Sequence, residues 1–352
     1  MQSWSRILKE SPVDWLLEES NPSIRYFTLA EILDKSENDA EVVAAKKAIP
    51  NSKTVTKIFA KQNPDGSWMV PHRPYLPKYK ASYWTVMTLS QLGVDKTDPR
   101  MRKACELIFL FQHAEGGFTS FTLKHATEEY EHLQQKKGKK LPKPITEMAQ
   151  ALVYEQQMSC LTGNVCAALI RAGYKDDSRV KKALEWLVKI QFKDGGWLCP
   201  YWKAHIRDTH SCFYGTICPL EAFSELPRQD LTKPMKQTVE KGAEWVLMHR
   251  LFKADHHGYK VIKQAWLKLG FPWFWGYNIL RGLDILTKLG YTRDERLNDA
   301  VEVLMQKRQK DGTWLLETAP VGRMHANLEP KNKPSKWITL IALRTLKRLS
   351  EK

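Results

Sequence analysis

Residues 177–197 read DSRVKKALEWLVKIQFKDGGW, and the chain repeats this pattern twice more, at 98–118 and 294–314. Each copy begins with Asp-x-Arg, continues with Ala-x-Glu, and ends with Gln or Arg followed by Asp/Glu-Gly-x-aromatic. A fourth ending, QNPDGSW, occupies residues 62–68 without the preceding part. Repeats on this scale indicate one supersecondary unit stacked on itself. The repeat therefore decides the architecture before any functional residue is considered.

Each copy is predicted to form an amphipathic outer helix. Its opening Asp suits an N-cap, apolar residues follow at helical spacing, and the closing Asp-Gly or Glu-Gly pair ends the helix. Between the copies lie segments that are more apolar and poorer in charge, as expected of helices buried on all sides. These inner helices are predicted to start at Ser23, Ser82, Ser159, Ser211, about Pro272, and Ser335.

Six inner helices that alternate with outer ones predict an all-α fold, a single (α/α)6 toroid that spans residues 1–352 as one domain. One interval between inner helices is longer than the others because it holds a charged insertion at about 122–157. We expect this insertion to be a mobile flap or a surface loop rather than a domain.

The composition fits a globular chain with a strong positive charge. Its 352 residues are 43% hydrophobic and include 13 Trp, which is enough for a sizeable core, and the formal net charge is +16. Such a charge favours anionic partners, including a membrane surface, but a lysine-rich solvated surface is the favoured explanation. No basic block with interleaved aromatic residues occurs, so nucleic acid is not an expected partner.

Neither the N-terminus nor any later segment has the apolar run of a signal sequence or a membrane span. Six cysteines in a chain of this length do not resemble a disulfide framework. We therefore expect reduced thiols and a cytoplasmic location, with peripheral contact to a membrane as the alternative. The sequence predicts no oligomeric state.

The Gln-x-x-Asp-Gly-x-Trp endings resemble the QW motifs of the terpenoid cyclase and protein prenyltransferase toroid superfamily, and the resemblance extends over about 23–346. It implies the toroid fold, in which the motif braces the outer helices: the Gln bonds helix-end backbone and the aromatic ring stacks on it. The Asp-x-Asp-Asp acid motif of the squalene–hopene branch is absent, and the chain is about half as long as members of that branch.

In an alternating toroid, each connection from an outer helix to the next inner helix emerges at the same mouth. The connection with the most metal-ligating side chains is 198–212, and Cys160 begins the preceding inner helix. Thiolates and imidazoles suit tetrahedral zinc, and a helix N-terminus lowers a thiol pKa. We therefore expect a zinc site at this mouth, with buried packing thiols as the alternative; the candidate ligands are Cys160, Cys199, His210 and Cys212.

The resemblance implies that the metal site is of one of two kinds. Prenyltransferase β subunits bind zinc through Asp, Cys and His, and Asp208 with Cys212 is similar although the spacing differs. Lanthionine cyclases use two Cys and one His, which Cys160, Cys212 and His210 match in type.

Catalytic and substrate-binding candidates complete the predicted site. Glu221 is interpreted as a general base, with a structural salt bridge as its alternative, and Arg281 with Asp284 as a pair along one helix face. Asp208 is predicted either to bind the metal or to lie beside a residue that does. His205, in the same connection, is a further catalytic candidate. Aromatic rings suit an isoprenoid chain, although core packing explains them equally well. The predicted substrate-binding residues are Tyr83, Trp84, Phe213, Tyr214, Trp273, Trp275, Tyr277, Trp337, Arg207 and Arg281.

Together these features predict an enzyme that acts on a hydrophobic, isoprenoid-like substrate, with a zinc–thiolate site at the mouth of the cavity. The alternatives are a non-catalytic protein that binds a lipid, terpenoid or peptide, and a subunit of prenyltransferase-β type that needs a helical partner.

Overall fold

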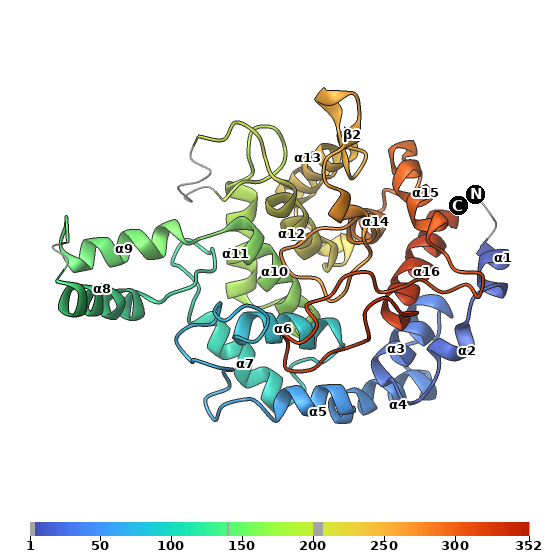
Figure 1. The fold of residues 1–352 in the computed structure, drawn as a ribbon, viewed down its shortest axis with the longest axis horizontal. Coiled ribbons are helices and arrows are strands. Elements are labelled where there is room, and N and C mark those ends of the chain that lie inside the picture. The colour runs from blue at the N-terminus through green and yellow to red at the C-terminus, as the bar shows by residue number, and fades with distance from the viewer. Residues whose placement is uncertain (1–3, 139–140, 200–206, 352) are drawn as a thin grey trace. The chain divides into compact units, whose positions relative to one another are not determined.

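The protein is almost entirely helical (Figure 1). A computed structural model describes residues 4–138, 141–199 and 207–351. Within them the only strands are β1 (Lys253–Ala254) and β2 (Lys260–Val261), which pair antiparallel. The helices are α1 (Trp4–Lys9), α2 (Val13–Leu16), α3 (Pro22–Phe27), α4 (Ala40–Ala48), α5 (Lys53–Phe59), α6 (Ser82–Gln91), α7 (Pro99–Phe109), α8 (Leu123–Lys137), α9 (Ile145–Glu155), α10 (Ser159–Leu169), α11 (Ser178–Lys189), α12 (Phe213–Ser224), α13 (Lys233–Met248), α14 (Ile279–Lys288), α15 (Asn298–Gln306) and α16 (Lys336–Ser350).

The chain divides into two compact units. Unit 1 comprises Met1–Ala60, Gln91–Val94 and Ala243–Lys352, and unit 2 comprises Lys61–Ser90 and Asp95–Gly242. Each unit contains both amphipathic helices and helices that are buried nearly all round, such as α12 in unit 2 and α14 in unit 1. The predicted fold class is confirmed in its all-α composition and in this alternation. The assignment of a single domain stays a prediction.

In two copies of the repeat the outer helix begins as predicted, whereas in the third Asp294 caps the 3₁₀ turn Glu295–Leu297 that precedes α15. The carboxylate of Asp98 accepts a bond from the backbone N–H of Arg100 at the start of α7, and Asp177 does the same for Arg179 in α11. Such a cap satisfies an N–H group that the first helical turn leaves without a partner. The Arg179 guanidinium also binds Glu106 of the preceding copy, 2.7 Å from Nη1 to Oε2. The positions that the copies share therefore join one copy to the next.

The closing glutamines of unit 2 connect neighbouring outer helices, as the repeat predicts. The Nε2 group of Gln112 donates to its own turn at Gly116 O and to Arg179 O in α11. Gln191 makes the same two bonds, to Gly195 O and to Thr238 O in α13. One side-chain amide thus donates to two backbone carbonyls that would otherwise lack a hydrogen-bond donor from the protein.

The aromatic residue of each motif then ties the loop to the next inner helix. The backbone N–H of Phe118 donates to the hydroxyl of Thr162 in α10 at 2.9 Å, and Trp197 N–H donates to Thr216 in α12 at 3.0 Å. The Trp197 indole donates back to Leu187 O of its own outer helix. Each motif therefore fixes both the helix before it and the helix after it.

The inner helices α10 and α12 pack closely within unit 2. A Cβ atom at Gly163 would lie 2.4 Å from the backbone of Cys218 and Pro219, so only glycine permits this approach. Arg171, in the π-helical turn Ile170–Tyr174 that follows α10, bridges Glu221 of α12 and the C-cap residue Glu225, the latter at 2.7 Å. The buried ionic groups are therefore paired, as their burial requires.

In unit 1, α14 packs against α16 through a buried carboxylate. Asp284 of α14 accepts bonds from Arg344 at 2.6 and 2.7 Å and from Arg348 at 2.9 Å, both on α16. The prediction that Arg281 pairs with Asp284 is wrong. The Arg281 guanidinium instead donates to the backbone carbonyls of Phe274 and Gly276.

The predicted start of the fifth inner helix needs correction. This helix begins at Ile279, capped by Asn278, rather than near Pro272. The preceding residues are held by tertiary bonds instead: both backbone groups of Trp273 bind the side-chain amide of Gln91.

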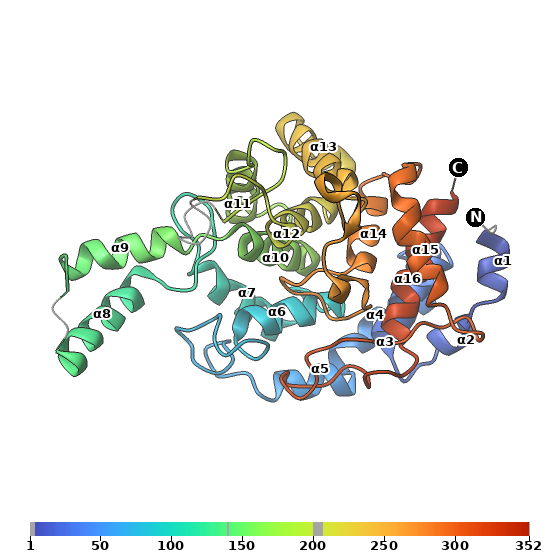
Figure 2. The same ribbon diagram turned by 45° about the horizontal axis from the view of Figure 1, so that its top comes forward.

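The insertion 122–157 is a helical hairpin rather than a loop. Its helices α8 and α9 lie side by side and extend away from the rest of unit 2 in both views (Figure 2). Their contact is a small apolar cluster of Ala126, Ala149 and Val153, flanked by Phe121 and Leu152.

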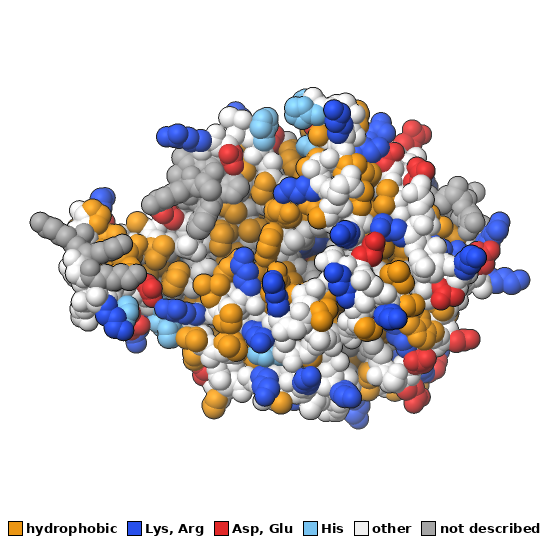
Figure 3. Space-filling model, in the orientation of Figure 1, with side chains coloured by type: hydrophobic (Ala, Val, Ile, Leu, Met, Phe, Trp, Pro, Cys, Tyr) orange, Lys and Arg blue, Asp and Glu red, His pale blue; other side chains and the backbone are white. Residues whose placement is uncertain are grey.

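In Figure 3, Lys and Arg side chains are spread over the face shown instead of forming one patch. Among the described residues, no helix is long and apolar enough to cross a membrane.

Candidate functional site

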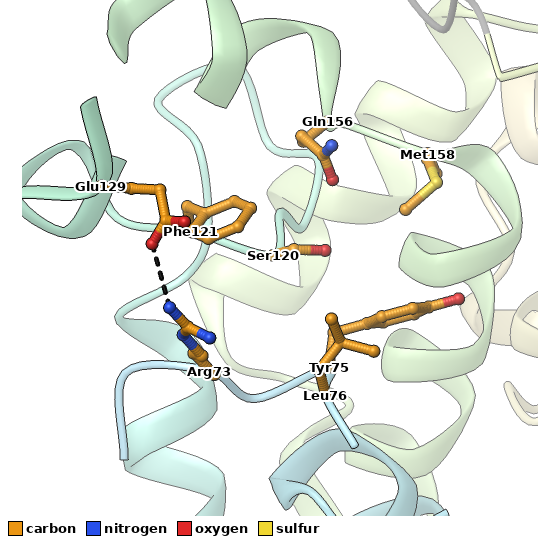
Figure 4. A pocket seen from close by; sticks show the side chains of 8 residues that line it. All are labelled: Arg73, Tyr75, Leu76, Ser120, Phe121, Glu129, Gln156 and Met158. Carbon is orange, nitrogen blue, oxygen red and sulfur yellow. Dashed lines mark hydrogen bonds and ion pairs between the residues drawn. The ribbon is translucent and has the colours of Figure 1, made fainter. Parts of the chain in front are cut away.

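A pocket of about 440 Å³ lies in unit 2, where the loop after the first motif meets the helical hairpin (Figure 4). Its lining comes from the loop 69–81, from the segment that enters α8, and from the residues between α9 and α10. The lining residues are Arg73, Tyr75, Leu76, Ser120, Phe121, Glu129, Gln156 and Met158.

The pocket has an ionic side and an apolar side. In Figure 4, Arg73 and Glu129 face each other on one side and the Tyr75 ring lies on the other. Arg73 Nη2 donates to Glu129 Oε2 at 2.9 Å, and both side chains remain partly exposed. Phe121 and Met158 supply apolar surface, as expected of a site for a small hydrophobic molecule.

Tyr75 forms the inner wall and is supported from behind by Trp84. The two rings lie 5.0 Å apart, and the Trp84 indole donates to Tyr75 O at 2.7 Å. Burial raises the pKa of the Tyr75 phenol, and the nearby thiols Cys160 and Cys199 raise it further. The phenol is therefore neutral and next to the thiol pair.

The structure brings together Cys160 and Cys199, two of the predicted metal ligands. Their Sγ atoms are 3.9 Å apart, and the hydroxyl of Ser159 lies 3.8 Å from the Cys199 sulfur. The contact with Cys199 and burial together raise the pKa of the Cys160 thiol well above its usual range.

Cys212 caps α12, where its sulfur accepts the Gly215 N–H at 3.1 Å. The expectation that helix N-termini lower the pKa of Cys160 and Cys212 is wrong. Burial raises the pKa of Cys212 by more than the bond from Gly215 lowers it. Both thiols are therefore protonated at neutral pH.

The residues described do not assemble the predicted zinc site. Zinc–sulfur bonds of about 2.3 Å in a tetrahedral site place two sulfurs roughly 3.8 Å apart, which the Cys160–Cys199 pair satisfies. Among residues 4–138, 141–199 and 207–351, however, no three His, Cys, Asp or Glu side chains form a group that fits a metal ion. Asp208 and His210 are exposed, and His205 lies outside the described residues.

Glu221 has the structural partner that its alternative interpretation predicted. Its ion pair with Arg171 lies inside unit 2, and its side chain is 3% exposed. A general-base role for Glu221 stays a prediction. In this structure its carboxylate is paired with Arg171, which it would have to leave in order to accept a proton.

The predicted aromatic residues of unit 2 lie behind the pocket or in the core. The Tyr83 hydroxyl donates to Thr119 O, Trp84 supports Tyr75, and Phe213 is buried in α12. Tyr214 is half-buried on the same helix, and Arg207 is exposed.

The other predicted aromatic residues belong to unit 1. Trp273 and Tyr277 donate their side-chain hydrogens to Gly270 O and Leu251 O, and Trp337 stacks on Phe271 at 4.5 Å. Trp275 is half-buried. None of the predicted substrate-binding residues is among the residues that line the pocket of unit 2.

The sequence does not indicate the pocket residues themselves. Arg73 and Tyr75 lie in a predicted connection at the mouth, which is a usable signal. Glu129 and Phe121 lie in or beside the insertion, for which the sequence predicts a surface element without a site.

Comparisons with known proteins agree with the resemblance carried by the motifs. No family model matches the chain. A curated relative, the lanosterol synthase erg7A of Aspergillus fumigatus, is 20% identical over 231 residues, which are 62% of this chain and 28% of that protein. The chain thus spans little more than a quarter of that relative. This sequence match confirms the resemblance to terpenoid cyclases.

Solved structures give low similarity scores over most of the chain. A protein from Actinoplanes has a TM-score of 0.45 at 12% identity, covering 96% of this chain and 90% of its own. The type II terpene cyclase MstE from Scytonema, with geranylgeranyl dihydroxybenzoate, has a TM-score of 0.43 at 14% identity, covering 94% of this chain and 87% of its own.

Proposed function

We propose that the chain binds a hydrophobic, isoprenoid-like molecule in the pocket of unit 2 and acts on it as an enzyme of the terpenoid cyclase type. The observation that carries the proposal is the pocket itself, about 440 Å³ with a lining dominated by Leu76, Phe121, Met158 and the Tyr75 ring. Pockets of this size and character accept small apolar ligands. The motifs and the resemblance to a lanosterol synthase favour an isoprenoid among them.

The catalytic part of the proposal rests on the thiols beyond Tyr75. The Cys160 thiol is protonated at neutral pH because its contact with Cys199 and its burial raise its pKa, so nucleophilic use of Cys160 would require removal of a proton. Zinc bound to this pair stays a prediction. Elemental analysis of the purified chain tests it, and loss of stoichiometric zinc in both Cys160→Ser and Cys199→Ser would support it.

A binding protein without catalysis is the second candidate. The carboxylates predicted or found near the site are either paired, as Glu129 is with Arg73 and Glu221 with Arg171, or exposed, as Asp208 is. Glu129 or Glu221 would have to be released from its arginine before it could serve as the acid that starts a cyclisation.

Binding and product formation distinguish these candidates. Calorimetric titration measures the binding of farnesol and geranylgeraniol, and incubation followed by mass spectrometry shows whether either is converted. Met158→Trp fills the pocket and should weaken binding by about tenfold or more. Leu110→Trp is the matched control, because Leu110 is 68% exposed at the end of α7.

Equal binding to Met158→Trp and to the unaltered chain would contradict the assignment of the pocket. Binding without any product from either alcohol would favour the non-catalytic candidate.

A further inference from the structure

The pocket carries its charge at one place only, among the residues that line it. Arg73 and Glu129 are the ionic residues in the lining, and the remainder are apolar, aromatic or neutral polar groups. A pocket that took only hydrocarbon would gain nothing from an ion pair in its wall, since charged groups are costly to cover with an apolar ligand.

The ion pair can be opened at small cost. Its side chains are 47% and 39% exposed, and exposed pairs of this kind contribute little to stability because water screens them. The two residues also come from different elements, Arg73 from the loop 69–81 and Glu129 from α8. Separating them therefore requires no change within a helix.

Arg73 is suited to hold an anionic group in place of Glu129. A guanidinium binds carboxylates and phosphates through two parallel N–H bonds, with geometry that a lysine does not offer. The loop beside it adds no acidic residue, because positions 69–81 contain His72, Lys78 and Lys80 but neither Asp nor Glu. Glu129 is therefore the competitor that a bound anion would displace.

The shape of the pocket places such a group opposite the apolar wall. Figure 4 shows Phe121 and Ser120 between the ion pair and the Tyr75 ring. A molecule with its head at Arg73 would lay its chain past Phe121 toward Met158 and Tyr75, in the direction of the thiol pair.

We propose that the ligand of this pocket is an isoprenoid-like amphiphile with an anionic head group, a carboxylate or a phosphate, which takes the place of Glu129 on Arg73. This inference rests on the proposed function and adds the substrate class to it. Arg73 is then a specificity-determining residue, and Glu129 sets how strongly an anion must compete.

The competition between Glu129 and the ligand gives two variants opposite effects. Arg73→Gln removes the anion's partner and should weaken anion binding. Glu129→Gln removes the competitor and should strengthen anion binding, although both variants break the same ion pair. A purely structural role for the pair would instead make both variants weaken binding.

The experiment is a calorimetric titration of the full chain with farnesol, farnesoic acid and farnesyl monophosphate. We expect the two anions to bind about tenfold or more tightly than the alcohol. Arg73→Gln should abolish that preference, and Glu129→Gln should raise it several-fold, while farnesol binding changes little in either. If only one anion shows the preference, the head group is assigned to that class.

Lys143→Gln and Glu147→Gln on α9 and the turn before it are the matched controls. They break an ion pair of the same hairpin with the same changes of charge, and neither residue lines the pocket. Equal binding of all three ligands, or a preference that survives Arg73→Gln, would overturn the inference while leaving the pocket assignment intact. Failure of all three ligands to bind would contradict the proposed function itself.

Discussion

At the scale of single residues, Asp284 shows how a buried charge is kept in the core of unit 1. Burial favours the neutral carboxyl, but Arg344 and Arg348 outweigh burial and lower the pKa of Asp284 to about 2. The carboxylate is thus ionised wherever the protein is folded near neutral pH. Its two partners lie on α16, so the interaction connects α14 to the last helix of the chain.

Asp284→Asn should destabilise the chain by about 3 kcal/mol at pH 7, because the partly buried Arg344 and Arg348 lose the carboxylate that they share and Arg344 keeps only Glu31. Urea unfolding measures the change. A group with a lowered pKa contributes stability above its unfolded pKa, which is lost as the pH falls through the folded value. The difference from the unaltered chain should therefore persist from pH 7 to 5 and shrink below about pH 4.

Asp176→Asn is the control for this prediction. Asp176 is 76% exposed beside Lys175, and its replacement should change the free energy of unfolding by less than about 0.5 kcal/mol. Equal effects of the two variants would show that the Asp284 ion pairs add nothing beyond a surface contact.

At the scale of elements, the closing turn of each motif needs a glycine for two separate reasons. Gly195 has a φ of +94°, and a Cβ atom there would lie 2.8 Å from Lys241 O of α13. Gly116 repeats both features, with a φ of +119° and Lys182 O at 2.6 Å. The turn can touch the neighbouring outer helix only because its side chain is a single hydrogen.

Gly195→Ala should therefore lose more stability than backbone strain alone explains. Gly258→Ala provides the comparison, because Gly258 also has a positive φ, +64°, but a Cβ atom added there would have no neighbour within 4 Å. We expect about 1–2 kcal/mol for strain at Gly258 and a clearly larger loss at Gly195, measured by thermal unfolding. Equal losses would mean that the contact with α13 relaxes freely.

The elements that the sequence predicts well are those whose signals are local. An Asp cap and a Gly-aromatic ending specify an outer helix within about twenty residues, and α7 and α11 follow them. The start of α14 is not predictable in this way, because residues before it bind Gln91, which is remote in sequence. The hairpin is not predicted from the sequence, because its highly charged composition is typical of a surface loop and the contact between α8 and α9 involves only a small apolar cluster.

At the scale of the whole molecule, the formal net charge is +16, and the Lys and Arg side chains form no single patch on the face shown in Figure 3. A distributed positive charge acts over a Debye length and is screened by salt. Contact with an anionic surface stays a prediction, and it would be of this weak, diffuse kind.

The chain should therefore sediment with vesicles that contain phosphatidylserine at low ionic strength and not with pure phosphatidylcholine vesicles. Raising NaCl to about 0.5 M should release it, because the Debye length falls to a few ångströms. Binding that survives this salt, or equal binding to neutral vesicles, would point to apolar insertion instead.

The candidate site can be predicted only in part, because some of its contacts join segments that are distant in the sequence. The repeat predicts that Cys160 and Cys199 lie at the same end of the inner helices, and their sulfur atoms are 3.9 Å apart in the structure. It cannot indicate that Arg73 meets Glu129, because that contact depends on how the insertion folds back on the loop 69–81. Nor can it show that burial raises the pKa of Cys212 by more than the bond at the helix start lowers it.

The hydrogen bond between Phe118 N–H and Thr162 determines how the insertion that carries α8 and α9 could be replaced. It anchors both ends of the segment that carries α8 and α9, so the residues between them add to the wall of the pocket without altering the helices below. Hairpins of other lengths or sequences should be exchangeable at this place. A library of grafted segments between positions 119 and 158 would then vary ligand preference on a constant scaffold.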